Sequence, residues 1–254
     1  MRLKTSRLFT LLFALFLLPA VWAKSGGITI TLANGEWPPL QGQQLPDFGP
    51  ASQVVTRALA LRGIRVRYEF MPWRRALEES RKGNFAGTLL WSLNDDRKQH
   101  FWFSDAVYRS KTVLFYHHAK PVFWKNLPDL AGKKMGVTNG YSYGDEWEKL
   151  QREQVFLTDI GNTDEQNLAK LLSQRIDGFP CELLVCQHLI ATHFPPITQK
   201  ILLFQPRPVH SETMHVLFSK NRSNGQWLAE QFNLGLQELK RSGELRRLLP
   251  GLDH

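Results

Sequence analysis

The segment KMGVTNGYSYGDEWEKLQ, residues 134–151, combines a strand, a tight turn and a helix. Lys134–Thr138 is typical of a strand, Gly140–Gly144 of a turn, and Asp145–Gln151 of a helix. Strand–turn–helix units of this kind build α/β proteins. Because the same order of patterns occurs before and after this segment, we predict an α/β fold with mostly parallel sheets.

The patterns on either side form two similar α/β halves. Thr163 opens a capping box, in which its hydroxyl and the Gln166 side chain can satisfy free backbone donors of a helix. We expect the last helix to return to the first half. The predicted strands are 28–33, 64–70, 88–91, 112–116, 134–138, 175–179 and 215–219, and the predicted helices are 54–61, 73–83, 145–151, 163–172, 182–191 and 227–241.

The N-terminus has the three parts of a secretory signal peptide in the right order. Basic residues within the first seven positions precede an apolar run at Leu8–Leu18, and Pro19 ends any helix before the small residue Ala23. The alternative is a transmembrane anchor, but the run is well short of the roughly 20 residues that span a bilayer. We therefore expect residues 1–23 to be removed and the mature protein to be periplasmic.

Net charge argues against a nucleic-acid partner. The chain of 254 residues carries +9, which falls to about +6 without the three basic residues of the signal, and the excess is spread rather than gathered into runs. The remaining length is enough for one large domain or two small ones with proper cores.

Two cysteines, Cys181 and Cys186, remain in the mature chain. In an oxidising compartment they could form a disulfide. A bridge requires Cα atoms no more than about 7 Å apart, which a regular helix over this spacing would not allow. The bridge becomes feasible if Cys181 lies before the predicted helix, and the alternative is two buried thiols.

Three side chains near predicted strand ends could meet a ligand. Arg97 could grip a carboxylate with two hydrogen bonds, or it could pair with Asp95 or Asp96 at the surface. Trp37 could stack on a ligand, or it could pack into a contact between its loop and the core. Glu182 could accept an ammonium group, or it could offset a helix dipole.

The turn Gly140–Gly144 also matches the G-x-S-x-G pattern of serine hydrolases, with Ser142 as nucleophile. The match is short, and no oxyanion loop of the His-Gly-Gly kind precedes it. The competing interpretation is a helix N-terminus whose free N–H groups hold an anionic ligand. No spacing favours one of the histidines that could supply a triad base: His188, His193, His210 and His215.

Five segments, in order and over nearly the whole mature chain, resemble the periplasmic solute-binding proteins of family 3, which bind polar amino acids for ABC transporters. They are the first-strand loop Asn34–Pro39, the stretch Asp96–Tyr108 (similar to eR…dFS.pY), the turn Lys134–Ser142 (similar to K-x-G-V-x-x-G-[ST]-[ST]), the strand Arg175–Gly178 and the tail Leu236–Leu249.

The resemblance implies a role for each matched residue. Trp37 would stack on the ligand and Arg97 would clamp its α-carboxylate, which the turn at Tyr141 and Ser142 would also meet. Glu182 stands where the family places an acid on the ligand ammonium. The expected ligand-binding residues are Glu36, Trp37, Trp91, Ser92, Arg97, Tyr141, Ser142 and Glu182.

The resemblance also implies a fold of the Venus flytrap kind, with two α/β lobes, two parallel or mixed sheets flanked by helices, and two hinge strands between them. Lobe 1 would comprise residues 24–111 and 211–254, and lobe 2 residues 112–210. The ligand would lie in the cleft between the lobes, at the carboxyl ends of the strands, as in other open α/β sheets.

Some residues depart from the family pattern. Leu89, Leu90 and Trp91 stand where small hydroxyl residues usually precede the arginine, and Asn94 replaces a frequent threonine. Glu182 is one methylene longer than the usual aspartate. The rim of the pocket is therefore expected to be bulkier and more apolar than in a standard amino acid binder.

These observations predict a periplasmic solute-binding protein that captures a small carboxylate-bearing ligand for an ABC transporter. One alternative is an enzyme, either a hydrolase acting through Ser142 or a lyase using Glu36 and Glu182 as acid and base. Another is a periplasmic sensor of the same fold. The expected partner is a membrane permease or a sensor, and we expect a monomer with no nucleic acid, cofactor or metal.

Overall fold

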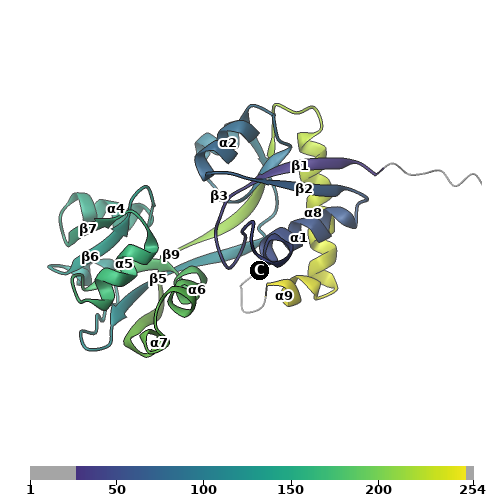
Figure 1. Ribbon diagram of the computed structural model, residues 1–254. Helices are drawn as coiled ribbons and strands as arrows, with labels where there is room; N and C mark the ends of the chain where they lie inside the picture. Colours follow the sequence, from purple (N-terminus) through teal and green to yellow (C-terminus); the bar gives the residue numbers. More distant parts are fainter. Residues whose placement is uncertain (1–26, 250–254) are drawn as a thin grey trace, which may run out of the picture.

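In the computed structural model, which describes residues 27–249, the chain forms two α/β lobes connected by two long strands (Figure 1). The strands β5 (Tyr108–His117) and β9 (Leu202–Ser219) run antiparallel from one lobe into the other. The predicted two-lobed α/β fold class is confirmed. The predicted signal peptide lies outside the described residues. Within 27–249, no helix has the length and apolarity needed to cross a bilayer.

Lobe 1 is a mixed sheet with α2 on one face and α1 and α8 on the other (Figure 1). β1 lies parallel to β2 and β3, and the end of β9 lies antiparallel between β3 and β4. The bounds are β1 Thr29–Asn34, β2 Arg65–Phe70, β3 Gly87–Ser92, β4 Phe101–Phe103, α1 Pro50–Ala60, α2 Trp73–Arg81, α3 Asp95–His100, α8 Gly225–Arg241 and α9 Glu244–Leu248, with a 3₁₀ turn at Pro46–Phe48.

The C-terminal helix α8 returns to lobe 1, as the sequence predicted. Its apolar stripe is buried against α1 and the sheet and includes Leu228, Phe232 and Leu236. The close approach of the two helices depends on Gly235, because a Cβ there would stand 2.0 Å from the Ala58 carbonyl oxygen. A helix remote in sequence thereby completes the core of the first lobe.

Lobe 2 is built on the other ends of β5 and β9. β8 lies between β5 and β6, and β7 pairs with the other side of β6. Side chains of β5 alternate between two cores: Leu114 belongs to the one under α4, whereas Val113 and Phe115 belong to the one under α5 and α6. The bounds are β6 Lys134–Thr138, β7 Leu157–Gly161, β8 Gly178–Glu182, α4 Asp145–Arg152, α5 Asp164–Leu172, α6 Leu183–His193 and α7 Thr198–Ile201, with a 3₁₀ turn at Leu127–Leu130.

The sheets of the two lobes are joined in one hydrogen-bonded ladder. Within the described residues, nine strands form a sheet in the order β2-β1-β3-β9-β5-β8-β6-β7, with β4 also paired to β9. The ladder is continuous because β9 is far longer than the predicted strand 215–219. Its prolines are tolerated because the register with β5 shifts around Pro208, where a strand can lack a backbone donor.

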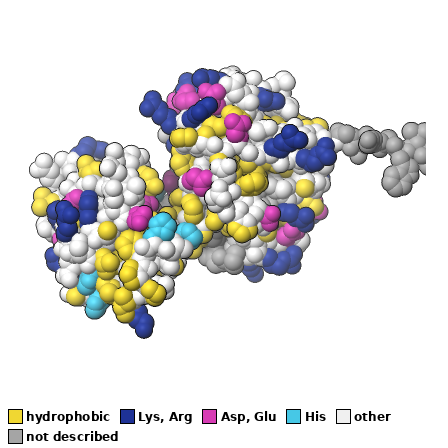
Figure 2. Space-filling view, in the orientation of Figure 1, with side chains coloured by type: hydrophobic (Ala, Val, Ile, Leu, Met, Phe, Trp, Pro, Cys, Tyr) yellow, Lys and Arg dark blue, Asp and Glu magenta, His cyan; other side chains and the backbone are white. Residues whose placement is uncertain are grey.

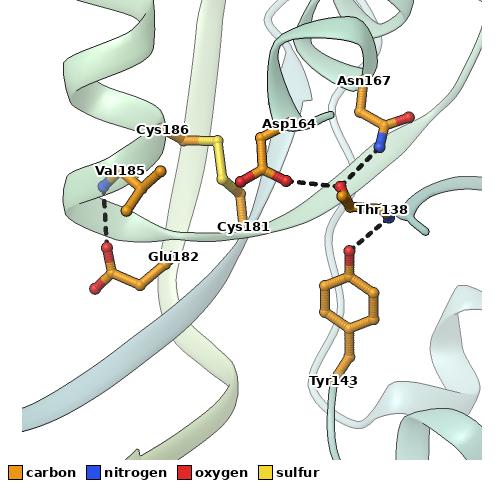
Figure 3. Close-up of a disulfide and its surroundings, with 8 residues drawn as sticks. All are labelled: Thr138, Tyr143, Asp164, Asn167, Cys181, Glu182, Val185 and Cys186. Atoms are coloured by element: carbon orange, nitrogen blue, oxygen red, sulfur yellow. Dashed lines mark hydrogen bonds between the residues drawn. A yellow bond between two sulfur atoms is a disulfide. The ribbon is translucent and has the colours of Figure 1, made fainter. Parts of the chain in front are cut away.

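Lobe 2 also holds the disulfide. Cys181 lies on β8, Cys186 lies in the first turns of α6, and their sulfur atoms are bonded, with the Cα atoms 6.1 Å apart (Figure 3). Of the two alternatives left open by the sequence, the structure therefore contains the bridge. Strand β8 is three residues later than the predicted 175–179, which places Cys181 before the helix. The predicted cap of α5 is present, since the Thr163 hydroxyl accepts from the Gln166 N–H.

Candidate ligand-binding site

A cavity of about 580 Å³ lies between the lobes, and residues of both lobes line it. The space-filling view shows that the molecule is narrower where the two lobes meet (Figure 2). The lining side chains come from five places: the segments after the lobe 1 strands, the connecting strands β5 and β9, the turn between β6 and α4 with the first residue of α4, the start of α5, and the end of β8. They are Trp37, Ser92, Leu93, Asn94, Arg97, Ser110, Thr112, Tyr141, Ser142, Tyr143, Asp145, Asp164, Cys181, Glu182, His210, Glu212 and Met214, with Gly140 and Gly144.

Arg97 is the cationic side chain that lobe 1 contributes. Asn94 caps α3 by accepting from the Arg97 N–H at 3.0 Å, which places Arg97 in the first turn of the helix that follows β3. Its Nη1 donates to the Ser92 carbonyl oxygen at 2.9 Å and to the Ser92 hydroxyl at 3.1 Å. Its guanidinium lies 4.7 Å from the centroid of the Trp91 ring. Burial lowers the pKa of Arg97, as expected of a cation partly withdrawn from water.

The two aspartates considered as surface partners of Arg97 lie near other cationic or titratable side chains. Asp95 pairs with Lys98 at 2.9 Å, and Asp96 lies 4.0 Å from His100. Arg97 is half-buried and faces the cavity. A guanidinium held on one edge by Ser92 keeps further N–H donors for an anionic group in the cavity.

Glu182 is the acidic side chain that the end of β8 contributes. It is the N-cap of α6, where its Oε2 accepts from the Val185 N–H at 2.9 Å (Figure 3). The disulfide closes around it, with Cys181 immediately before it. Burial raises the pKa of Glu182 to about 7, because the charged form loses hydration. The helix-capping role and a place in the cavity therefore occur together, rather than as alternatives.

His210 and Glu212 are site residues that the sequence analysis did not select as ligand contacts. They lie on β9 together with Met214, and all three line the cavity because alternate side chains of a strand share a face. The carboxylate of Glu212 lies 3.5 Å from His210 Nε2 and raises the pKa of that histidine. Burial opposes ionisation of Glu212, but interactions with His210, Ser92 and Arg97 outweigh it and hold the pKa of Glu212 below its usual range. Recognising 202–219 as one strand would have revealed this alternation.

The turn after β6 is fixed by a buried polar network (Figure 3). Tyr143 is buried, and its hydroxyl accepts from the Thr138 N–H at 2.7 Å. The Thr138 hydroxyl donates to Asp164 at 2.6 Å and accepts from Asn167 at 3.0 Å. Every member comes from the lobe 2 side of the cavity. The network positions the exposed residue Tyr141 at the mouth of the cavity.

Ser142 is bonded to a carboxylate rather than to a histidine. Its hydroxyl donates to Glu148 Oε1 at 2.5 Å. His210 lies close to the backbone of the same turn: a Cβ atom on Gly144 would stand 2.6 Å from His210 Nδ1. Within residues 27–249, no cluster of three or more histidine, cysteine, aspartate or glutamate side chains has a metal-binding arrangement.

The structure brings most of the predicted residues together. Trp37, Ser92, Arg97, Tyr141, Ser142 and Glu182 line the main cavity. Trp91 lines a smaller cavity of about 290 Å³ that adjoins it. Glu36 lines neither of them: it is exposed, and its carboxylate accepts from the Gln43 N–H at 3.0 Å. Contact of each of these residues with a ligand stays a prediction.

Comparison with known proteins identifies the family of the chain. A family model, the bacterial extracellular solute-binding proteins of family 3, matches residues 53–250. The chain belongs to this family. The match extends over most of both lobes and includes four of the five segments on which the resemblance was based; the first-strand loop Asn34–Pro39 lies before it.

Solved structures share the fold of this solute-binding protein at low sequence identity. A histidine kinase sensor domain similar to periplasmic binding proteins aligns with a TM-score of 0.70 and 17% identity over 89% of this chain and 97% of its own. An ancestral arginine-binding protein bound to arginine aligns with a TM-score of 0.67 and 17% identity over 87% and 96%. The arginine-bound substrate-binding protein AbpA of an amino acid ABC transporter from Streptococcus pneumoniae gives 0.65 and 20% over 89% and 94%. A search of curated proteins finds no significant match.

Proposed function

We propose that this solute-binding protein captures a small, amino-acid-like ligand with a carboxylate and delivers it to an ABC transporter from the periplasm. One observation carries the proposal: a guanidinium from lobe 1, Arg97, and a carboxylate from lobe 2, Glu182, line the same cavity. An α-amino acid offers the complementary charges, a carboxylate for the first and an ammonium for the second. The solved structures of amino acid binders with the same fold support this choice of ligand.

Ligand-driven closure of the lobes would couple binding to transport. The predicted lobe boundaries lie opposite each other on the two connecting strands, where Lys111 pairs with Ser211 and Thr112 with His210. Bending there would bring the turn at Tyr141 toward Arg97. The closed state would be favoured because a ligand contacts both lobes at once only in that state. A permease would then recognise the closed monomer.

A sensor is the second candidate function. It is favoured by one observation, the similarity of the fold to a histidine kinase sensor domain over nearly its whole length. Both functions use the same closure, so they differ in the partner that reads it. Stimulation of ATP hydrolysis by a reconstituted permease would support transport, and stimulation of a kinase would support sensing.

We propose that Ser142 is a binding-turn residue rather than a nucleophile. Its hydroxyl donates to Glu148, and a carboxylate is not the imidazole base on which the serine triad depends. An activated fluorophosphonate should therefore leave the native protein unlabelled, as judged by intact mass. Stoichiometric labelling that disappears in Ser142→Ala would contradict the proposal and favour a hydrolase. The lyase alternative is disfavoured because Glu36 lies outside the cavity that holds Glu182.

A thermal-shift screen of amino acids, small peptides and organic acids tests the proposed ligand class. A ligand at a hundredfold excess over its dissociation constant should stabilise the folded protein by about 2.7 kcal/mol. We expect stabilisation by at least one amino acid and less by the matched acid that lacks the amino group. Stabilisation only by compounds without a carboxylate would contradict the proposal.

A further inference from the structure

The smaller cavity beside the main one is walled by aromatic rings. Trp37, Trp73 and Trp91 of lobe 1 and Tyr141 of lobe 2 line its volume of about 290 Å³, and none of its lining residues is charged. We call this smaller cavity the aromatic cavity. It is continuous with the cavity of Arg97, because both are lined by Trp37, Ser92, Gly140, Tyr141 and Met214.

The indole rings of the aromatic cavity offer carbon surface rather than polar atoms. Trp73 packs edge to face with Trp37 (centroids 6.4 Å apart, 89° between planes) and with Trp91 (5.2 Å, 84°). The Trp73 N–H donates to the Glu36 carbonyl oxygen at 3.2 Å, and the Trp91 N–H donates to the Thr88 hydroxyl at 3.0 Å. Two of the three indole donors are therefore used within lobe 1.

We propose that the aromatic cavity receives an aromatic ring on the side chain of the ligand, so that the substrate class is aromatic amino acids. The inference rests on the proposed function, because the carboxylate of the same ligand would be held by Arg97 in the adjoining cavity. A cavity on the order of 150 Å³ holds a benzene molecule, so about 290 Å³ has room for a phenyl or an indole ring. Aromatic rings favour edge-to-face contacts of the kind that Trp73 already makes with Trp37 and Trp91.

A cationic side chain is the main competing occupant, because cations are attracted to the faces of aromatic rings. The structure argues against it in two ways. The Arg97 guanidinium already lies over the ring of Trp91 and would repel a second cation. No carboxylate lines the aromatic cavity to neutralise one. The acidic side chains Glu182 and Glu212 line the main cavity instead.

Calorimetric titration with L-phenylalanine, L-tryptophan, L-leucine and L-arginine tests the inference. We expect at least one aromatic amino acid to bind about tenfold or more tightly than L-leucine. Trp73→Ala should weaken the aromatic ligand by about tenfold and leave the affinity for L-leucine nearly unchanged. The matched control is Trp227→Ala, which removes a tryptophan that is 39% exposed on α8, away from both cavities, and should change neither affinity.

Melting curves for each variant establish that it is folded. If Trp73→Ala does not fold, Trp73→Phe replaces it in the test: because it keeps a ring, it should retain part of the wild-type affinity for the aromatic ligand. Tighter binding of L-leucine or L-arginine, no binding of either aromatic amino acid, or an equal loss for all ligands in folded Trp73→Ala would overturn the inference. Failure of the proposed function has a different result: an aromatic ligand would still depend on Trp73, but its affinity would be unchanged in Arg97→Ala.

Discussion

Replacing Arg97 with alanine should weaken ligand binding by about thirtyfold to several thousandfold. The reason is that a ligand carboxylate beside Arg97 would have left water and gained charge-assisted hydrogen bonds. Removing one partner of such a buried pair leaves the other charge unpaired, which costs about 2–5 kcal/mol. At about 1.4 kcal/mol per decade, this gives the expected range of affinities. The measurement is calorimetric titration of wild type and Arg97→Ala with the ligand found in the screen.

The fold should survive this substitution. The side-chain contacts of Arg97 are with Ser92 and the Trp91 ring at the edge of the cavity, and it is not part of a hydrophobic core. Arg97→Lys should recover only part of the affinity, because an ammonium lacks the planar fork of donors. Arg67→Ala, on the exposed face of β2, removes an equal charge and should leave binding unchanged. Unchanged affinity in a folded Arg97→Ala protein would mean that no ligand carboxylate lies there.

The sequence was sufficient to predict most of the longer strands and helices in order, though not the strands β4 and β7, and the neighbourhood of Arg97 and Glu182. Glu182 is the last residue of β8, Arg97 lies in the short helix that follows β3, and the carboxyl ends of strands face the cleft of an open α/β sheet. Asn94 and Glu182 then cap the helices that follow, which fixes the chain locally. Local patterns of this kind depend on neighbouring residues and can be recognised without the fold.

Features that depend on long-range pairing could not be predicted. Pro206 and Pro208 indicate a break, yet β9 continues through them because the register shift with β5 accommodates a missing donor. His210 and Glu212 were missed for this reason. The sequence predicts a helix over 73–83, but it does not show that the ring of Trp73, the first residue of α2, packs against Trp37 and Trp91 beside the cleft.

Replacing Glu182 with glutamine should remove the partner of the ligand ammonium and weaken binding by a similar amount, about 2–5 kcal/mol. The substitution preserves the helix cap, because the amide oxygen of glutamine can accept from the Val185 N–H as the carboxylate does. The melting temperature of the ligand-free protein should therefore change little. The matched comparison is a ligand that lacks the amino group: it should bind wild type and Glu182→Gln almost equally.

The pH dependence of binding separates this charge effect from a change of shape. Burial raises the pKa of Glu182 to about 7 in the ligand-free protein, so the carboxyl is protonated at lower pH, and an ammonium ligand must displace that proton. Affinity should therefore rise with pH up to about 7, by at most about tenfold per pH unit, and binding below that pH should release a proton.

The stability of the ligand-free protein should change with pH in the opposite direction. Since the folded protein holds the proton of Glu182 more tightly than the unfolded chain, the free energy of unfolding should fall as pH rises through 7. His210 and Glu212 also titrate in the cavity, so the decisive quantity is the difference between wild type and Glu182→Gln. Equal pH profiles for the two proteins would assign the ammonium to another partner.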